Sequence, residues 1–393
     1  MKPTISSMLD TDLYKISMGQ FVHFQYPDVD ARYRLFNRGN TAFPPGFGHR
    51  LAEEVEKMAE LKTETAELEF LRKACPWIKP SYLDWLSTYR FNPSEIRIHQ
   101  LGDCLDIQAE GPWYRSIFWE VPLMATVSEI FFSMTGQKPN AEWQEKARHK
   151  AQRLFGQKVG WADFGTRRRY SYAVQEEVLR QTMALSQEGS QGGLIGTSNV
   201  HFAHKLGLKP IGTMAHEIFM VLGAAFGYPI ANRLAMEGWV KEFDGRLGIA
   251  LPDTFTTDVF LRDFSWQFAK QFDGVRQDSG VPEEFVEKII NHYKKLGIKP
   301  MEKTIVFSDG LDAERAIELS QYCRDRIKCS FGIGTNLTND VGVRPLNIVI
   351  KVVAARKAEG PWLPAGKLSD DKGKWTGNDP QVFEAIRTTL GIV

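Results

Sequence analysis

The spacing of hydrophobic positions divides the chain into two unlike regions, and the change falls near Pro122. In the first region hydrophobic and polar residues alternate over Val29–Asn37, which predicts a strand with Val29, Ala31, Tyr33 and Leu35 on one face. Residues 47–61 then show helical spacing, and three short β-like segments follow at 95–100, 104–109 and 115–120. Elements of both kinds without a regular alternation predict an α+β unit.

Beyond Pro122, helical spacing covers residues 121–134 and 140–155, and short apolar runs then alternate with helical stretches such as 199–206, 283–296 and 313–323. The predicted strands are 159–164, 194–196, 210–212, 247–251, 272–275, 304–307 and 329–333. Strands separated by helices favour parallel βαβ units and an α/β fold. Seven such strands suit an irregular barrel better than a small open sheet, and an open doubly wound sheet remains the alternative.

The last part of the chain returns to strands and turns at 351–374 and ends in a short helix after Gly377. We therefore expect an N-terminal domain at residues 1–125, rejoined by 346–393. Residues 126–345 are expected to form the barrel and to carry the site.

Each predicted strand of the second region ends in small, acidic or basic residues, and a barrel directs all these ends to one rim. Arginines beside Gly-Thr and Gly-Ser turns suit phosphate or carboxylate. Asp253, Asp278 and Asp309 offer oxygen atoms that could hold Mg2+ or its waters, or accept from ribose hydroxyls. The rim residues are those of 163–169, 196–199, 214–217, 252–254, 276–280, 308–310 and 332–336. Together they predict a phosphorylated sugar as the ligand.

His216 stands at one of these strand ends, in Ile211-Gly212-Thr213-Met214-Ala215-His216-Glu217. A neutral imidazole can act as a nucleophile, so a histidine placed there could accept a phosphoryl group. The other interpretation is a histidine that caps or lines the following helix. Position alone does not separate the two.

The composition of the chain argues against some classes of binding partner. The 393 residues include 49 basic and 48 acidic ones, a net charge of +1, so no overall field favours nucleic acid or an anionic membrane. No two of the 4 cysteines are spaced as a C-x-x-C pair, a pattern that fits a protein of the reducing cytoplasm. The first residues lack the features of a signal peptide, and we expect no run of about 18 apolar residues that would span a bilayer. An anionic ligand must therefore be held by local clusters of charge.

Some of the motifs have an ordinary structural explanation. The run Arg167-Arg168-Arg169 is typical of a solvated helix start. Gly332-Ile333-Gly334 lacks the third glycine of a dinucleotide fingerprint, since Leu337 stands in its place. His201 and His204 lie three residues apart on a predicted helix, but no thiolate or third ligand is spaced to complete a metal site.

Taken in order, the motifs resemble those of the nicotinate phosphoribosyltransferase family, in its bacterial type. The matching stretches cover nearly the whole length, and they are Thr11-Asp12-Leu13-Tyr14-Lys15, Asp163-Phe164-Gly165-Thr166-Arg167, Gly196-Thr197-Ser198-Asn199, Met214-Ala215-His216-Glu217, Arg276-Gln277-Asp278-Ser279-Gly280 and Phe331-Gly332-Ile333-Gly334-Thr335-Asn336-Leu337.

This resemblance implies the fold of type II phosphoribosyltransferases, an irregular α/β barrel with an N-terminal α/β sandwich, in a cytoplasmic homodimer with shared active sites. It implies that nicotinate and 5-phosphoribosyl 1-diphosphate are joined to give nicotinate mononucleotide and diphosphate. ATP hydrolysis would be coupled to this reaction through a phosphohistidine at His216, with Mg2+ present.

The resemblance also implies roles for single residues. The pyridine ring would stack between Phe164 and Tyr14 of the neighbouring subunit, with Arg276 near its carboxylate and Arg167 directed at the phosphates. Asp253 and Asp278 would be catalytic and would hold the metal, directly or through water. The other substrate-binding residues that we expect are Ser198, Asp309, Gly310, Gly332, Gly334 and Thr335.

Other functions remain open. A nicotinamide phosphoribosyltransferase carries an aspartate after Gly-Thr, where this chain has Ser198, and an added carboxylate there would repel nicotinate. A quinolinate phosphoribosyltransferase would need more cations for its decarboxylation. A Schiff-base aldolase would need a lysine at a strand end, and these strand ends supply arginine, aspartate and histidine instead. A non-catalytic phosphate-binding barrel would have no need of a nucleophilic histidine.

Overall fold

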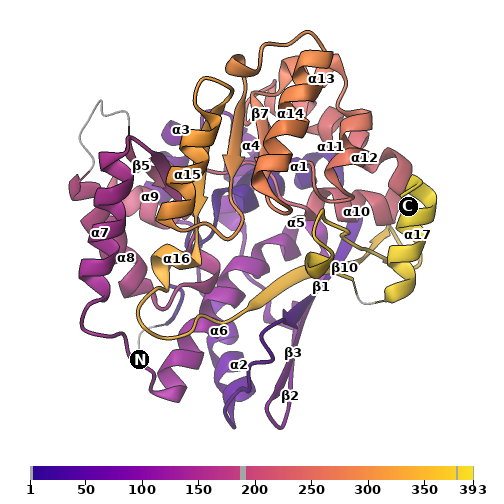
Figure 1. Ribbon diagram of the computed structural model, residues 1–393. Coiled ribbons are helices and arrows are strands. Elements are labelled where there is room, and N and C mark those ends of the chain that lie inside the picture. The colour runs from indigo at the N-terminus through magenta and orange to yellow at the C-terminus, as the bar shows by residue number, and fades with distance from the viewer. Residues whose placement is uncertain (1–2, 186–191, 378, 393) are drawn as a thin grey trace.

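The computed structural model describes residues 3–185, 192–377 and 379–392. One of its two sheets is antiparallel, in the order β11-β10-β1-β3-β2. Its strands are β1 (Val29–Asn37), β2 (Ile96–Leu101), β3 (Cys104–Pro112), β10 (Ile348–Lys357) and β11 (Leu363–Pro364). β10 pairs with β1 along its whole length, from Val29 opposite Lys357 to Asn37 opposite Ile348. The end of the chain thus completes a sheet that its beginning starts (Figure 1).

The second sheet is parallel, and its six strands follow the order β5-β4-β9-β8-β7-β6. They are β4 (Gly160–Asp163), β5 (Gly193–Thr197), β6 (Ile249–Ala250), β7 (Gly274–Gln277), β8 (Thr304–Phe307) and β9 (Lys328–Ile333). All of their carboxyl ends face the same way because every pairing is parallel. The predicted α/β fold with its irregular barrel is confirmed.

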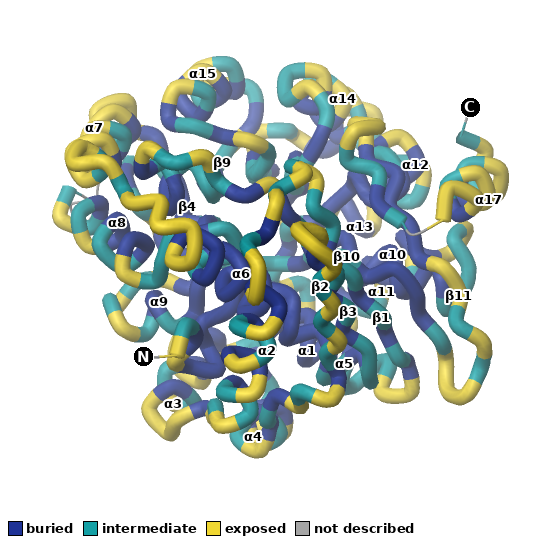
Figure 2. Tube along the Cα trace, turned by 90° about the horizontal axis from the view of Figure 1, so that it is seen from below, coloured by how far each residue is buried: buried dark blue, intermediate teal, exposed yellow. Residues whose placement is uncertain are grey.

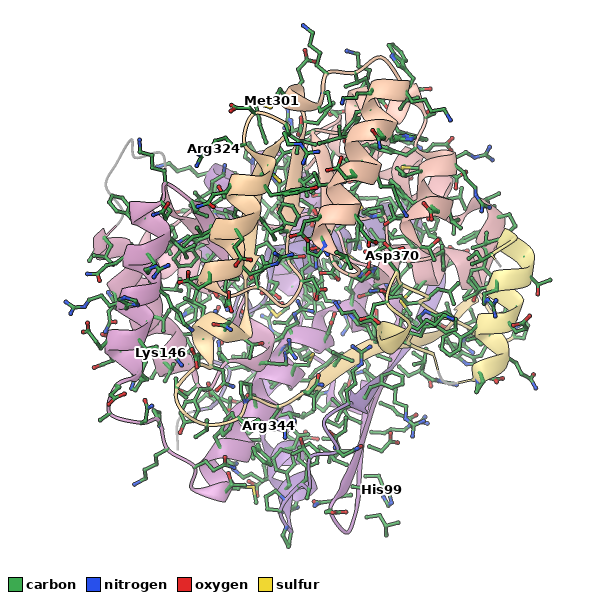
Figure 3. The ribbon with its side chains drawn as sticks, in the orientation of Figure 1. His99, Lys146, Met301, Arg324, Arg344 and Asp370 are labelled. Carbon is green, nitrogen blue, oxygen red and sulfur yellow. The ribbon has the colours of Figure 1, made fainter. Side chains whose placement is uncertain are left out.

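Helices cover both sheets, and exposed residues lie along the outer faces of helices such as α3, α7, α14 and α17 (Figure 2). Side chains such as His99, Met301 and Arg324 lie at the periphery (Figure 3). The α-helices are α1 (Leu13–Gln25), α2 (Phe47–Met58), α3 (Thr65–Ala74), α4 (Pro80–Thr88), α5 (Trp113–Ser116), α6 (Glu120–Thr135), α7 (Trp143–Gly156), α8 (Tyr172–Leu185), α9 (Val200–Leu206), α10 (Glu217–Phe226), α11 (Tyr228–Phe243), α12 (Thr257–Asp263), α13 (Trp266–Gln271), α14 (Pro282–Lys295), α15 (Ala313–Cys323), α16 (Thr335–Thr338) and α17 (Pro380–Leu390).

The β-like segment expected at 115–120 is wrong, because these residues are helical, in α5, a 3-10 turn at Ile117–Trp119 and the start of α6. Trp113, Ile117, Phe118 and Trp119 are all buried, at 1% exposure or less. Ser116 and Glu120 are buried as well, so polar and apolar residues do not mark opposite faces here and the pattern cannot tell the type of element.

The strand expected at 210–212 is reduced to a single parallel bridge between Thr197 and Pro210. Pro210 has no N–H to donate to a ladder. Gly212 packs against the N-terminal segment, where a Cβ atom would lie 3.0 Å from the backbone nitrogen of Tyr14. The barrel is therefore irregular at the point where α10 begins.

One helical stretch, Trp113–Thr135, is long and apolar enough to cross a membrane by length and composition. It contains Arg115, Glu120 and Glu129, so it is not the unbroken run of about 18 apolar residues that was expected to be absent. Of its most apolar window, 83% is buried inside the protein. The stretch belongs to the buried core, where its α6 packs against α2 and β10.

Candidate active site

The carboxyl ends of the parallel strands open onto a cavity of about 550 Å³. Phe164 and Arg167 come from the turn after β4, Asp278 from the end of β7, Asp309 and Gly310 from the end of β8, and Gly334 from the end of β9. Tyr14 of α1 and a set of lysines from the last part of the chain complete the wall. Parallel strands collect their loops at one edge, and this edge is where such folds bind ligands.

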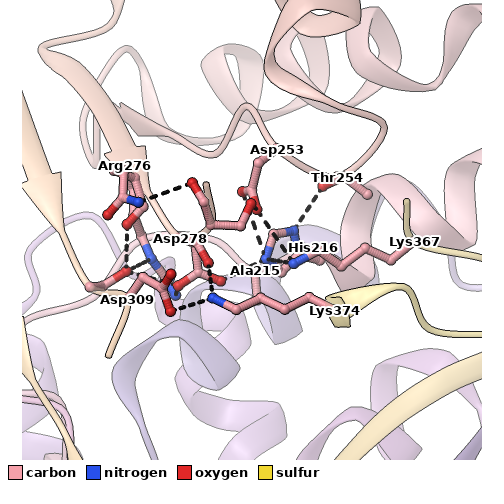
Figure 4. A network of polar contacts seen from close by, with 12 residues as sticks. Ala215, His216, Asp253, Thr254, Arg276, Asp278, Asp309, Lys367 and Lys374 are labelled. Carbon is pink, nitrogen blue, oxygen red and sulfur yellow. Dashed lines mark hydrogen bonds and ion pairs between the residues drawn. The ribbon is translucent and has the colours of Figure 1, made fainter. Parts of the chain in front are cut away.

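His216 is the residue before α10 and is 4% exposed. Its Nδ1 lies 3.0 Å from Oγ1 of Thr254, and its Nε2 lies 2.8 Å from Oδ2 of Asp278 and 2.9 Å from Nζ of Lys367. Figure 4 shows Asp253 and Thr254 reaching the imidazole from one segment and Lys367 reaching it from another. The ring is thus bonded at both nitrogens, with an acceptor and a donor competing for Nε2.

Burial, followed by the nearby Lys367 ammonium, lowers the pKa of His216 to about 4. The imidazole is therefore neutral at pH 7 and keeps one nitrogen lone pair. Burial opposes ionisation of the two neighbouring carboxyls, but the cations outweigh it. The Lys367 ammonium holds the pKa of Asp253 below its usual range, and Arg276, together with the hydrogen bond to His216, holds the pKa of Asp278 well below it. A neutral histidine between ionised aspartates is a candidate nucleophile.

The aromatic side of the cavity is made by Tyr14 and Phe164, which both belong to this one chain. The backbone N–H of Phe164 donates to the carbonyl of Ile333 at 2.8 Å, which fixes Phe164 beside β9. Gly332 leaves room for the ring, because a Cβ there would lie 2.3 Å from Cδ2 of Phe164. The expectation that a neighbouring subunit supplies the tyrosine of this wall stays a prediction.

The three successive arginines after β4 have three different environments rather than one solvated face. Arg169 is fully buried and pairs with both oxygens of Asp10, at 2.8 and 2.9 Å. Arg167 lines the cavity, with its Nε 3.5 Å from Oδ2 of Asp12. Arg168 also lines it and has no ion pair within the described residues. Burial, with Arg167 and Arg38 nearby, lowers the pKa of Arg168 to about 10.

On the opposite side Arg276 donates from Nη2 to Asp278 Oδ1 and from Nε to Ser308 Oγ, both at 2.7 Å. Its Nη1 has only a 3.5 Å contact to the carbonyl of Met214. Asp309 forms an ion pair with Lys374, whose ammonium also donates to the carbonyl of Asp278 at 3.0 Å. One edge of the Arg276 guanidinium is therefore left for a ligand.

The ligand atoms of His216, Asp253 and Asp278 lie within 4.8 Å of one another. Asp253 Oδ1 is buried and has no hydrogen-bond partner among the described residues. A free, ionised carboxylate oxygen beside a second carboxylate fits a hard cation such as Mg2+. Lys367, 3.4 Å from Asp253 Oδ2, neutralises part of the negative charge of this group.

The structure brings most of the expected site residues to this cavity, but two of them do not line it. Asp253 stands behind His216. Ser198 is buried, and its hydroxyl donates to Asp12 Oδ1 at 2.7 Å; Asp12 in turn contacts Arg167, which lines the cavity. The expected residues in the wall are Tyr14, Phe164, Arg167, His216, Arg276, Asp278, Asp309, Gly310, Gly332, Gly334 and Thr335.

Sequence reasoning missed the cations that come from outside the barrel strands. These are Arg38, from the turn after β1, and Lys351, Lys367 and Lys374, from β10 and the segment that follows β11. None of them stands at the end of a parallel strand, the position by which the other site residues were predicted. The alternation of polar and apolar residues along β10 could have predicted the face of the strand on which Lys351 lies. It could not have predicted that this face borders the cavity.

Comparison with known proteins gives matches over both regions of the chain. The model of the nicotinate phosphoribosyltransferase (NAPRTase) family matches residues 159–392, and the model of its N-terminal domain matches residues 9–128. Nicotinate phosphoribosyltransferases from Desulforapulum autotrophicum and Chromohalobacter salexigens are 50% and 48% identical, over 98% and 99% of both chains. The crystal structure of nicotinate phosphoribosyltransferase from Porphyromonas gingivalis has a TM-score of 0.95 at 41% identity, and the match covers 99% of this chain and 100% of that one.

Proposed function

This chain belongs to the nicotinate phosphoribosyltransferase family, and we propose that it joins nicotinate to 5-phosphoribosyl 1-diphosphate, with nicotinate mononucleotide and diphosphate as products. The observation that carries this proposal is one cavity with an aromatic wall, a partly free arginine and several cations. An aromatic acid and a polyphosphate together need these features.

Nicotinate would lie against the rings of Tyr14 and Phe164. A planar, electron-poor ring gains from aromatic stacking, and the pyridine carboxylate would gain a charge-assisted bond from the free edge of Arg276. Nicotinamide has no carboxylate and would leave the positive charge of Arg276 without this partner. The same contacts therefore favour the acid over the amide.

The ribose-bound phosphates would face the cationic side of the cavity, where Arg38, Arg167, Arg168, Lys351 and Lys374 stand. In the reaction the pyridine nitrogen forms a bond to the anomeric carbon, and the bond from that carbon to the diphosphate oxygen breaks with its electron pair. These cations stabilise the charge that develops on the leaving diphosphate. A pyridine nitrogen has a free lone pair, so no general base is required.

Asp253 and Asp278 would hold Mg2+, which when bound would neutralise part of the diphosphate charge. We also propose that His216 takes the γ-phosphoryl group of ATP. A P–N bond would form as the bond to the ADP oxygen breaks, and water would later remove the phosphoryl group. The lowered pKa of His216 supports this role because it keeps the imidazole neutral.

A cytoplasmic location and a homodimer, both implied by the resemblance, belong to the same proposal. In that dimer the active sites would be shared, with Tyr14 of one subunit facing Phe164 of the other.

The test is diphosphate release by the purified protein, measured with nicotinate, with nicotinamide and with neither. We expect release that depends on 5-phosphoribosyl 1-diphosphate and on nicotinate, at least tenfold faster than with nicotinamide, the scale of one lost charge-assisted hydrogen bond. Equal turnover of the acid and the amide would contradict the role of Arg276. No release with either would contradict the function itself.

A further inference from the structure

Glu120, the first residue of α6, does not line the cavity, yet its carboxylate contacts three residues that do. Tyr14 donates its hydroxyl to Oε2 at 3.0 Å, and Nη1 of Arg167 and Nζ of Lys351 lie 3.7 and 4.0 Å from Oε1. Glu120 itself is 5% exposed. We propose that Glu120 is a positioning residue for pyridine binding, which orients the ring of Tyr14 and the guanidinium of Arg167. This inference rests on the proposed function.

The charge of Glu120 is retained although the site is buried. Lys15, with no exposed side-chain surface, lies 2.7 Å from Glu120 and 2.6 Å from Glu217. Against the cost of burial, Lys15 and then Lys351 and Arg167 lower the pKa of Glu120 to about 2. The amino end of α6 also favours a carboxylate. Glu120 therefore remains an anion over the whole working range of pH.

Lys15 connects this carboxylate to the helix that follows His216. Glu217 is the first residue of α10, and it accepts from Tyr33 Oη at 2.6 Å and from Trp113 Nε1 at 2.7 Å. Neither Tyr33 nor Trp113 lines the cavity. The two glutamates thus have different roles. Glu217 anchors α10 in the core, and Glu120 connects that core to side chains of the cavity wall.

The effect of Glu120 on the wall follows from what Arg167 and Tyr14 touch. The Arg167 guanidinium lies between Asp12 and Glu120, and its central carbon is 5.9 Å from the centroid of the Tyr14 ring. A guanidinium with carboxylates on two sides has few other orientations. Without the Glu120 charge, Arg167 would turn towards Asp12, and the Tyr14 hydroxyl would lose its charged acceptor. The ring that faces nicotinate would then adopt more than one position.

The simpler explanation is that Glu120 only neutralises the buried Lys15. A matched control separates the two explanations. Glu95 is also a buried glutamate, 9% exposed, and it accepts from Trp119 Nε1 at 2.7 Å and from Arg115 Nε at 3.2 Å. Glu95, Trp119 and Arg115 are all absent from the cavity wall. Glu95→Gln therefore perturbs a buried ion pair without touching the groups that Glu120 orients.

The experiment compares Glu120→Gln, Glu95→Gln and the unmutated protein by steady-state kinetics and by labelling of His216 with ATP. For Glu120→Gln we expect KM for nicotinate to rise about tenfold, the scale of one charge-assisted hydrogen bond, with a smaller fall in kcat. Labelling of His216 should stay within about twofold of the unmutated protein, because the contacts of the imidazole are left in place. An unchanged KM, or an equal rise in Glu95→Gln, would overturn the proposal.

A second variant covers the case in which Glu120→Gln does not fold. Tyr14→Phe keeps the ring and all the ion pairs, and it removes only the hydroxyl that donates a hydrogen bond to Glu120. We expect a smaller but measurable rise in KM for nicotinate, and no rise would count against the proposal. If the unmutated protein turns over no nicotinate, the proposed function fails instead. Crystal structures of both variants would then still test whether Arg167 and Tyr14 move.

Discussion

At the scale of single residues, the chemistry of His216 depends on three neighbours that are far away in the sequence. Thr254, Asp278 and Lys367 hold both ring nitrogens. We predict that γ-labelled ATP transfers its label to His216, and that the label is lost in acid and stable in base, as a phosphoramidate is. His216→Asn should abolish both the label and any ATP stimulation of turnover. His204→Asn, outside the cavity, is the matched control, and labelling that survives in His216→Asn would refute the assignment.

The lowered pKa of His216 also predicts how stability depends on pH. The unfolded chain takes up a proton near pH 6.5, whereas the folded protein resists protonation down to about pH 4. This residue therefore contributes stability that is present above pH 6.5 and is lost as the pH falls to about 4. Urea unfolding of the unmutated protein and of His216→Asn should show a difference in the free energy of unfolding that shrinks by on the order of 2 kcal/mol over this window. A difference independent of pH would contradict the lowered pKa.

At the scale of elements, the pairing of β4 with β9 places the Phe164 ring. Gly332 stands opposite Ala162 in the parallel ladder, and the ring of Phe164 covers the space where a side chain at Gly332 would lie. Gly332 was expected to bind substrate directly. The structure gives it a second reason to be glycine, which is the close approach of an aromatic wall.

This geometry predicts the effect of a single methyl group. Gly332→Ala should force the Phe164 ring out of place, lower the free energy of unfolding by about 1 to 3 kcal/mol and raise KM for nicotinate. Gly156→Ala, at the end of α7, is the control, since a Cβ there meets no atom within 4 Å and should leave KM unchanged. Unaltered nicotinate binding in Gly332→Ala would show that Phe164 does not form the wall.

At the scale of the whole molecule, the resemblance implies a dimer in which Tyr14 of one subunit faces Phe164 of the other. We therefore predict that mixing an inactive Tyr14→Ala protein with an inactive Phe164→Ala protein restores activity, because one of the two sites in a mixed dimer keeps both aromatic residues. Subunit exchange must be checked with differently tagged chains, and the mass in solution by light scattering. Mixed dimers that form and stay inactive would show instead that each chain supplies both rings of its own site.

The sequence by itself determined the elements with a clear period and the groups at their ends. The strands of the parallel sheet were placed to within a few residues, β1, β8 and α15 without error, because alternation and helical spacing record which side chains face a core. The residues that follow β4, β7, β8 and β9 were found for the same reason, since parallel strands bring their carboxyl ends together whatever the remaining topology.

Only the tertiary structure decided what pairs with those groups. The ammonium of Lys367 reaches His216 from 151 residues away, and Glu120 meets Tyr14 across 106 residues. The sequence carries no period or spacing for such contacts, because they depend on how β10 and the segments around it fold back onto the barrel. The buried stretch at 115–120 was misread for a related reason: where every side is covered, burial is set by the neighbours in space and not by the pattern along the chain.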